Sequence, residues 1–255
     1  IVKFPLDDVQ ILTRYCSVEK PYFAAFLKHY SNLGIKSFHV LVQYIEEKNE
    51  IENHFFKKFP KLNIFIHKVS NKISPNKALE NFDISIINGI QKYTLLVDCD
   101  EFLYFGNRNM NISKLFLLNT EVKQFFIPWI IMPQITSDVP NLKGFWGHIG
   151  KPIALSKSIK KLRSVHSFEI KQKNFLKKFF SPISCPVGEH GIFLVHFWPR
   201  SFRDTLLKVF GQRLRNSKSK DRSRALEIIR SGDLPIRIRI MAYLDIQYKY
   251  LRCDE

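Results

Sequence analysis

The sequence is poor in cysteine and has no long apolar run. Its 255 residues include four widely separated cysteines with no C-x-x-C pair: Cys16, Cys99, Cys185 and Cys253. This spacing argues against a zinc site built from cysteines and favours a reducing compartment, so we expect a cytoplasmic protein. No apolar run reaches the ~18 residues that a transmembrane helix needs.

Two common phosphate-binding signatures are also missing. The segment after the first predicted strand reads Cys16-Ser17-Val18-Glu19-Lys20 and contains no G-x-G-x-x-G, and no Walker lysine loop occurs anywhere. The sequence therefore lacks both the dinucleotide fingerprint and the P-loop.

Positive charge and aromatic residues are abundant. The net charge is +17, and residues 141–255 hold nearly all of the excess, with 24 Lys+Arg against 9 Asp+Glu, compared with 16 against 14 in residues 1–140. Such a field favours phosphate-bearing ligands, anionic membrane surfaces or nucleic acid, without choosing among them. The 23 Phe lie mostly in periodic segments, which predicts a sizeable core.

The first hundred residues alternate between strand and helix patterns. We predict strands at 9–15, 36–42, 62–66 and 95–97, with helices at 21–33, 46–59 and 74–87. This alternation predicts an α/β fold with a mostly parallel central sheet flanked by helices.

The later segments are more varied. We predict a helix at 112–118, a strand at 122–131, a long irregular loop at 133–152, further strands at 161–166 and 192–197, and basic helices at 201–214, 221–230 and 235–251. We expect one domain over 1–215 and a basic helical extension, 216–255, packed on it.

Three acids follow the fourth predicted strand. Leu95-Leu96-Val97 reads as a buried strand, and Asp98, Asp100 and Glu101 come directly after it. Ligand crevices of open α/β sheets lie at the carboxyl ends of the strands. On an extended backbone Asp98 and Asp100 would point to the same side and could share one ion, for which Mg²⁺ or Mn²⁺ is suited. A solvated acidic turn is the plainer alternative.

Several segments together resemble a known family. They are Glu19-Lys20-Pro21-Tyr22, Val97-Asp98-Cys99-Asp100-Glu101-Phe102, Gly150-Lys151-Pro152-Ile153, Val165-His166-Ser167-Phe168 and Val195-His196-Phe197 with Arg200-Ser201-Phe202. Taken in order, residues 10–210 resemble the family-2-type glycosyltransferases of GT-A fold, in the bacterial branch with a D-x-D-E-F motif. The family's usual Asn after the first strand is Val18 here, and Gln43-Tyr44 occupies the place of its Asp after the second strand.

The resemblance implies a GT-A-like catalytic domain over 1–215. It also implies transfer of a sugar from a UDP- or GDP-linked donor to a hydroxyl of a glycan or glycolipid acceptor, in surface polysaccharide or glycolipid synthesis, with Mn²⁺ or Mg²⁺. The expected metal ligands are Asp98, Asp100 and His196. Donor contacts are expected from Glu19, Asp98, Lys151 and Arg200. Candidates for the base that takes the acceptor proton are Glu189, Asp138 and Glu101.

Plainer roles remain open for some of these residues. Lys151 could be a solvated surface lysine, His196 a hydrogen-bonded core residue, and Glu19 an acid at a helix N-terminus. Two alternative functions also remain: a phosphatase that uses D-x-D, and a non-enzymatic protein that binds nucleic acid or an anionic surface. We expect no nucleic-acid partner, and we include peripheral contact with the anionic inner face of a membrane among the expected partners.

Overall fold

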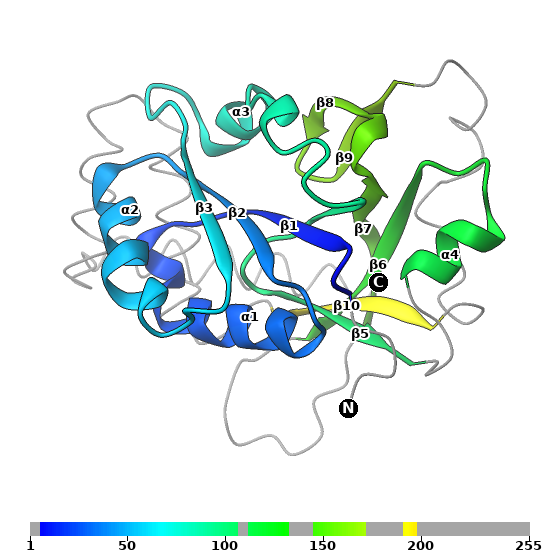
Figure 1. Ribbon diagram of the computed structural model, residues 1–255, viewed down its shortest axis with the longest axis horizontal. Coiled ribbons are helices and arrows are strands. Elements are labelled where there is room, and N and C mark those ends of the chain that lie inside the picture. Colours follow the sequence, from blue (N-terminus) through cyan, green and yellow to red (C-terminus); the bar gives the residue numbers. More distant parts are fainter. Residues whose placement is uncertain (1–5, 107–111, 133–144, 172–190, 198–255) are drawn as a thin grey trace, which may run out of the picture.

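Eight strands form one twisted sheet with helices packed against it (Figure 1). The computed structural model describes residues 6–106, 112–132, 145–171 and 191–197. The sheet contains β1 (Val9–Arg14), β2 (Ser37–Val42), β3 (Asn63–Lys68), β4 (Tyr93–Leu96), β5 (Glu101–Phe105), β6 (Gln124–Met132), β7 (Phe145–Leu155) and β10 (Ile192–Phe197). A separate hairpin contains β8 (Ile159–Ser164) and β9 (Ser167–Ile170).

The strand order is β3-β2-β1-β4-β7-β6-β10-β5. The first four strands in this order are mutually parallel, and β10 is parallel to β6. Only β7 and β5 run the other way. The α/β class with a mostly parallel sheet flanked by helices is therefore confirmed. The carboxyl ends of β1, β4, β6 and β10 meet at one edge.

The helices are short apart from the first. They are α1 (Lys20–Asn32), α2 (Ile45–Ile51) with a π-helical continuation (Glu52–Phe56), α3 (Pro75–Glu80) and α4 (Ile112–Leu118). The 3₁₀ segments are Ser17–Glu19, Ile84–Ile86 and Ser156–Ser158.

Helix α1 forms where its sequence pattern predicts. Pro21 occupies the first turn, where its missing N–H costs nothing. The buried side chains Phe23, Phe26, Leu27 and Tyr30 recur at helical spacing and make one apolar stripe. The helix ends before Gly34, whose φ of 96° is left-handed.

Alternating side chains of the central strands fill two cores, one on each face of the sheet. Ile11 and Val40 pack with the aromatic residues of α1, whereas their neighbours Leu12 and Leu41 pack with residues of α3 and β8. Period-two alternation on a strand produces this division. Both faces are thus covered, as expected for parallel strands.

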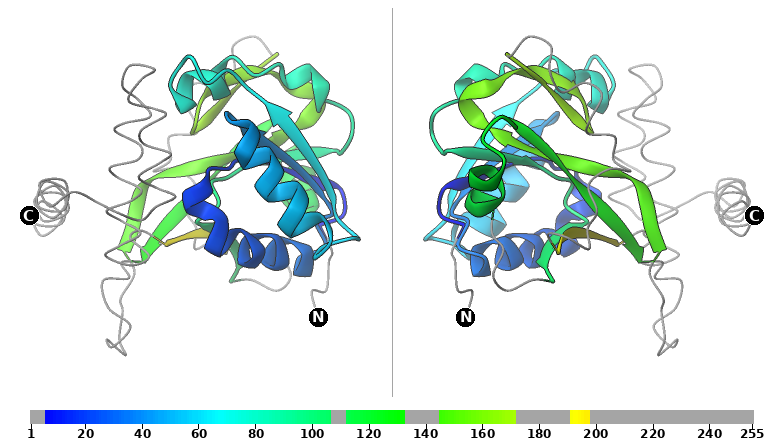
Figure 2. Two further views of the ribbon diagram at one scale, coloured as in Figure 1. Left: turned by 90° about the vertical axis from the view of Figure 1, so that its left-hand side faces the viewer. Right: turned by 90° about the vertical axis from the view of Figure 1, so that its right-hand side faces the viewer.

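The far end of the sheet curls back toward α1 (Figure 2). β5 is the last strand in the order, yet Tyr30 Oη of α1 donates to the Glu101 carbonyl at 2.9 Å. His29 Nε2 lies 2.9 Å from the Leu103 carbonyl. The curl brings the start of β5 next to the carboxyl ends of β1 and β4.

The structure differs from the predicted elements in several places, one of which is the strand β9, which was not predicted. The predicted helix over 74–87 is only α3 followed by a 3₁₀ turn, because the Asp83 side chain accepts a bond from Ser85 N and starts a new turn there. Part of the predicted loop over 133–152 is β7, and residues 133–144 lie outside the described residues. β5 was not predicted, since it begins within the acidic cluster.

The predicted C-terminal helices and the extension over 216–255 fall outside the described residues. The described residues all belong to the predicted domain over 1–215, and they form the sheet and its helices.

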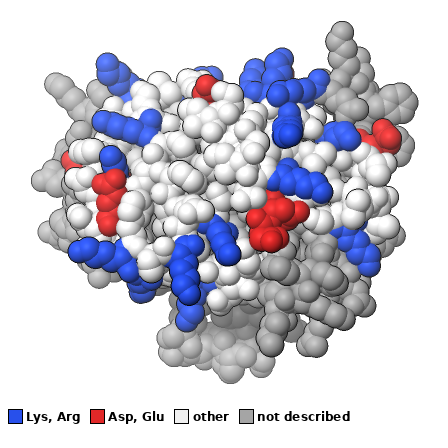
Figure 3. All heavy atoms as spheres, in the orientation of Figure 1, with Lys and Arg blue, Asp and Glu red and all other residues white. Residues whose placement is uncertain are grey.

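Lys and Arg side chains dominate the face over the β8–β9 hairpin (Figure 3). The exposed basic residues there are Lys157, Lys160, Lys161, Arg163 and Lys171. We call these five residues the hairpin lysine and arginine patch. Glu169 of β9 pairs with two of its members, at 3.0 Å from Lys160 and 3.3 Å from Lys161. The patch thus keeps a surplus of positive charge.

Candidate active site

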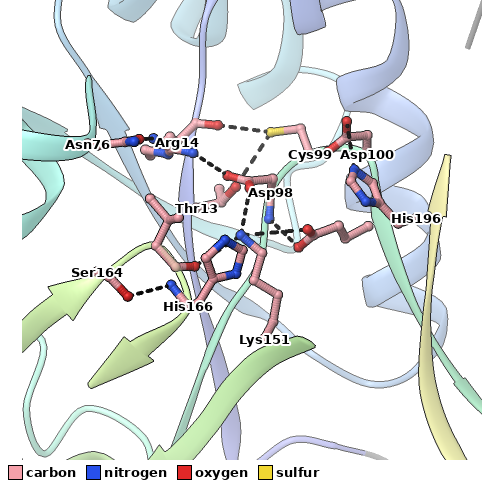
Figure 4. A network of polar contacts seen from close by, with 12 residues as sticks. Thr13, Arg14, Asn76, Asp98, Cys99, Asp100, Lys151, Ser164, His166 and His196 are labelled. Carbon is pink, nitrogen blue, oxygen red and sulfur yellow. Dashed lines mark hydrogen bonds and ion pairs between the residues drawn. The ribbon is translucent and has the colours of Figure 1, made fainter. Parts of the chain in front are cut away.

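A tight turn between β4 and β5 carries the acidic cluster. Glu101 N donates to the Asp98 carbonyl at 3.1 Å, so the backbone reverses instead of remaining extended. The Cys99 thiol is buried within the turn and donates to the Arg14 carbonyl at 3.2 Å. As a result Asp98 and Asp100 face different neighbours (Figure 4). The expectation that an extended backbone would direct them to one side is wrong for this turn.

Asp98 lies between two cations. Arg14 Nη2 donates to its Oδ1 at 2.9 Å, and Lys151 Nζ donates to its Oδ2 at 2.6 Å. Burial alone would raise the pKa of Asp98, but the Lys151 ammonium and the Arg14 guanidinium outweigh it and hold that pKa well below its usual range. Asp98 is therefore ionised throughout the physiological range.

Lys151 is a buried lysine in the middle of β7. Its side chain is only 1% exposed, which is unusual for lysine and requires compensating acids. Besides Asp98, its Nζ donates to the Val165 carbonyl at 3.1 Å and lies 3.6 Å from Glu101 Oε1. It also lies 5.7 Å from the centre of the Trp129 ring. The plainer role of a solvated surface lysine is excluded by this burial.

A second group of side chains contains two acids and a histidine: Asp100, Glu101 and His196. Each offers one potential ligand atom, and these atoms all lie within 4.8 Å of one another. Asp100 and Glu101 are 1% and 0% exposed, and His196 Nε2 lies 3.4 Å from Asp100 Oδ2. His196 is brought there by β10, where it pairs with Glu101 across the antiparallel ladder.

This group fits a divalent cation. Two buried carboxylates in close proximity repel each other unless positive charge is present. Glu101 Oε1 is buried and accepts no hydrogen bond from any residue in the described ranges. Burial raises the pKa of Glu101 to about 7 against the opposing effect of Lys151, and the Asp98 carboxylate adds to the increase. Carboxylate oxygen and imidazole nitrogen are ligands that Mn²⁺ accepts, while Mg²⁺ prefers the oxygens.

Five of the predicted site residues come together at this edge of the sheet: Asp98, Asp100, Glu101, Lys151 and His196. Glu19 is buried in the turn after β1 and is 5% exposed. The candidates Asp138, Glu189 and Arg200 lie outside the described residues. The predicted metal role of Asp98 stays a prediction; the three residues whose ligand atoms gather within 4.8 Å do not include it.

Three residues of the site were not predicted from the sequence. Arg14 ends β1. Asn76 is the second residue of α3 and accepts from Arg14 Nη1 at 2.6 Å, and Trp129 of β6 lies 4.7 Å from His196 between ring centres. A signal for Arg14 existed, because it is a charged residue near the end of the first predicted strand, and ligand crevices of open α/β sheets lie at such strand ends. Asn76 and Trp129 gave no such signal.

Comparison with known proteins gives limited likeness. No family model and no curated protein matches the sequence. Among solved structures, Staphylococcus aureus TarS 1–349 aligns with 58% of this chain at 12% identity and a TM-score of 0.37, and the chain spans about half of that structure, 47%. The alignment with a longer TarS structure covers 52% of this chain and 23% of that structure, at 14% identity and a TM-score of 0.29.

A Bacillus anthracis protein assigned as a glucose-1-phosphate thymidylyltransferase, in complex with sucrose, aligns with 59% of this chain and 72% of its own length. Its identity is 8% and its TM-score 0.36. Likeness at these scores does not establish a shared activity. Within the described ranges, no helix combines the length and the apolar character needed to cross a membrane.

Proposed function

We propose that the chain is a metal-dependent glycosyltransferase that moves a sugar from a nucleoside diphosphate donor to a hydroxyl acceptor. The observation that carries the proposal is the buried group of Asp100, Glu101 and His196 beside the cations Arg14 and Lys151, at the carboxyl ends of β1 and β4. A nucleoside diphosphate bound with a divalent cation matches both parts of this site. Its phosphates are negative, like the partners that Arg14 and Lys151 attract, and its cation is positive, like the partner that the acids attract. The family resemblance of the Asp98–Phe102 segment supports the same class.

In this proposal Asp100 and His196 hold the cation, with Glu101 beside them. The cation would offset the negative charge that develops on the leaving diphosphate. The acceptor oxygen forms a bond to the anomeric carbon while the bond from that carbon to the diphosphate oxygen breaks, and the acceptor proton passes to a carboxylate. The nucleoside diphosphate leaves with the electron pair.

Glu101 serves the cation in our proposal and is a poor candidate for the base. Its side chain is 0% exposed, and its Oε2 accepts from Asp98 N at 2.8 Å. A base must reach the proton of an incoming acceptor. The predicted candidates Glu189 and Asp138 therefore remain for that role, and Glu19 remains a predicted contact of the nucleotide.

The test is the release of nucleoside diphosphate from a panel of UDP- and GDP-linked sugars, with Mn²⁺ or Mg²⁺ and with EDTA. We expect release that needs the cation and falls about 100-fold or more in Asp100→Asn, because a charged ligand is lost at the point where charge develops. Asp7→Asn is the matched control, since Asp7 is exposed.

Two results would contradict the proposal. One is equal turnover in EDTA and in Mn²⁺. The other is turnover of Asp100→Asn equal to that of the native chain. Thermal unfolding with nucleoside diphosphates and Mn²⁺ provides a second readout, because a ligand that binds only the native state raises the melting temperature.

A further inference from the structure

Arg14 is held in place but its hydrogen-bonding capacity is not exhausted. Its Nη1 donates to Asn76 Oδ1 at 2.6 Å and its Nη2 to Asp98 Oδ1 at 2.9 Å. A guanidinium has five N–H donors in a fixed fork. Within the described part of the chain these two contacts use two of them. The side chain is 23% exposed, so its remaining donors can meet a ligand.

The two cations beside Asp98 differ in their acidic partners. Lys151 Nζ has two acids nearby, Asp98 and, at 3.6 Å, Glu101, whereas Arg14 forms an ion pair with Asp98 alone and shares that carboxylate with Lys151. Lys151 is 1% exposed and its Nζ lies within 3.6 Å of oxygens of Asp98, Val165 and Glu101. The more exposed Arg14 is therefore the cation of the pair that can bind an anion from solvent.

We propose that Arg14 binds the diphosphate of the donor, and that Asp98 and Asn76 are positioning residues that hold its guanidinium. This inference rests on the proposed function, and it names the residue that contacts the negatively charged part of the donor. A planar fork that is already oriented suits phosphate oxygens, which it can contact in pairs. Lys151 in turn neutralises Asp98 from the buried side.

The arrangement also gives the ligand a direction. The Asp98–Glu101 turn places the cation Arg14 on one side and the acidic group of Asp100, Glu101 and His196 on the other. A diphosphate with its cation matches both sides only if its phosphates face Arg14 and its cation faces Asp100. Asp98 then acts through Arg14 and does not hold the cation.

The experiment separates binding of the anion from binding of the cation. Calorimetry measures the affinity for UDP, GDP and inorganic pyrophosphate in saturating Mn²⁺, and electron paramagnetic resonance measures Mn²⁺ binding without nucleotide. We expect Arg14→Gln to weaken diphosphate binding about 10- to 100-fold, as expected for lost charged hydrogen bonds. Mn²⁺ affinity should stay unchanged.

Three further variants sharpen the result. Arg14→Lys should retain part of the diphosphate affinity, because the charge remains but the fork is lost. Asn76→Ala and Asp98→Asn should weaken diphosphate binding and leave Mn²⁺ binding intact, whereas Asp100→Asn should weaken Mn²⁺ binding directly. Arg163→Gln, an exposed arginine on β8, is the control. Thermal unfolding of each variant confirms that it is folded.

The outcomes are distinguishable. Native-like diphosphate affinity in folded Arg14→Gln or Arg14→Lys overturns this inference and leaves the proposed function standing. Loss of Mn²⁺ binding in Asp98→Asn equal to that in Asp100→Asn overturns the positioning role of Asp98. A native chain that binds neither Mn²⁺ nor any of the three diphosphate probes overturns both this inference and the proposed function.

Discussion

At the scale of single residues, the surroundings of a side chain decide its role more than its type does. Asp98 and Asp100 are two positions apart in one turn. The first is paired with Arg14 and Lys151, and the second lies beside His196. The sequence predicted that acids would gather here because a buried strand ended at them. Their division into two groups depends on the turn and on residues from three other strands, β1, β7 and β10.

His39 is a buried titratable residue outside the site. It is 1% exposed on β2, and its Nδ1 lies 3.0 Å from His67 Nε2 on β3. Its Nε2 has no hydrogen-bond partner among the described residues. Burial lowers the pKa of His39 to about 4, and the nearby His67 adds to the decrease. A protonated His39 would leave a buried N–H without an acceptor.

We therefore expect His39 to reduce stability in mild acid. The unfolded chain takes up its proton near the ordinary value of about 6.5, and the native state does so only near 4. The contribution of neutral His39 to the free energy of unfolding is therefore complete above about pH 6.5 and is lost as the pH falls toward 4.

Urea unfolding from pH 4 to 8 measures this contribution. Replacement with His39→Phe should reduce the slope of the unfolding free energy in that window by up to about 1.4 kcal/mol per pH unit, the value for one proton. Comparison with the native chain cancels the opposite trend expected from Glu101, whose raised pKa favours the native state on acidification. An identical slope in both proteins would refute the assignment.

At the scale of elements, β7 links the two halves of the sheet and carries Lys151. It pairs antiparallel with both β4 and β6. Gly150 precedes Lys151 and faces Pro128 where the register of β6 shifts. A Cβ at Gly150 would overlap the carbonyl of Ile127. This close approach of two backbones explains a glycine in the strand interior.

Gly150→Ala should therefore destabilise the fold and disturb the site. We expect a loss of about 1–3 kcal/mol, the usual cost of forcing atoms into an occupied space, together with weaker diphosphate binding because Lys151 moves. Chemical denaturation and calorimetry measure the two effects.

Gly106→Ala is the matched control for that substitution. Its Cβ would have its nearest neighbour at 3.5 Å, an ordinary contact. Equal stability of the two variants would show that the backbone at Gly150 has room to relax.

At the scale of the whole molecule, the positive charge is unevenly distributed. The hairpin lysine and arginine patch lies over β8 and β9, and the Val165 carbonyl at the tip of this hairpin contacts Lys151 in the site. An anionic surface attracts such a patch within about one Debye length. We therefore expect the chain to associate with anionic vesicles in low salt.

Vesicle flotation tests this expectation. The chain should float with vesicles that contain phosphatidylserine and not with vesicles of phosphatidylcholine alone, and association should fall as salt is raised. Replacement of Lys160, Lys161 and Arg163 by Ser should reduce it. Replacement of Lys57, Lys58 and Lys61 by Ser, three exposed lysines outside the hairpin, is the control for net charge. Equal flotation with both kinds of vesicle would rule out an electrostatic contact.

The sequence by itself determined the alternation of β1 to β4 with their helices, the core face of α1 and the acidic cluster after β4. These features depend on local periodicity and on residues adjacent in the chain. Only the tertiary structure decided that Arg14 and Lys151 share Asp98, that His196 joins Asp100, and that β5 curls back to α1. Such contacts join residues up to about a hundred positions apart, through strand order and a turn that no periodic pattern encodes.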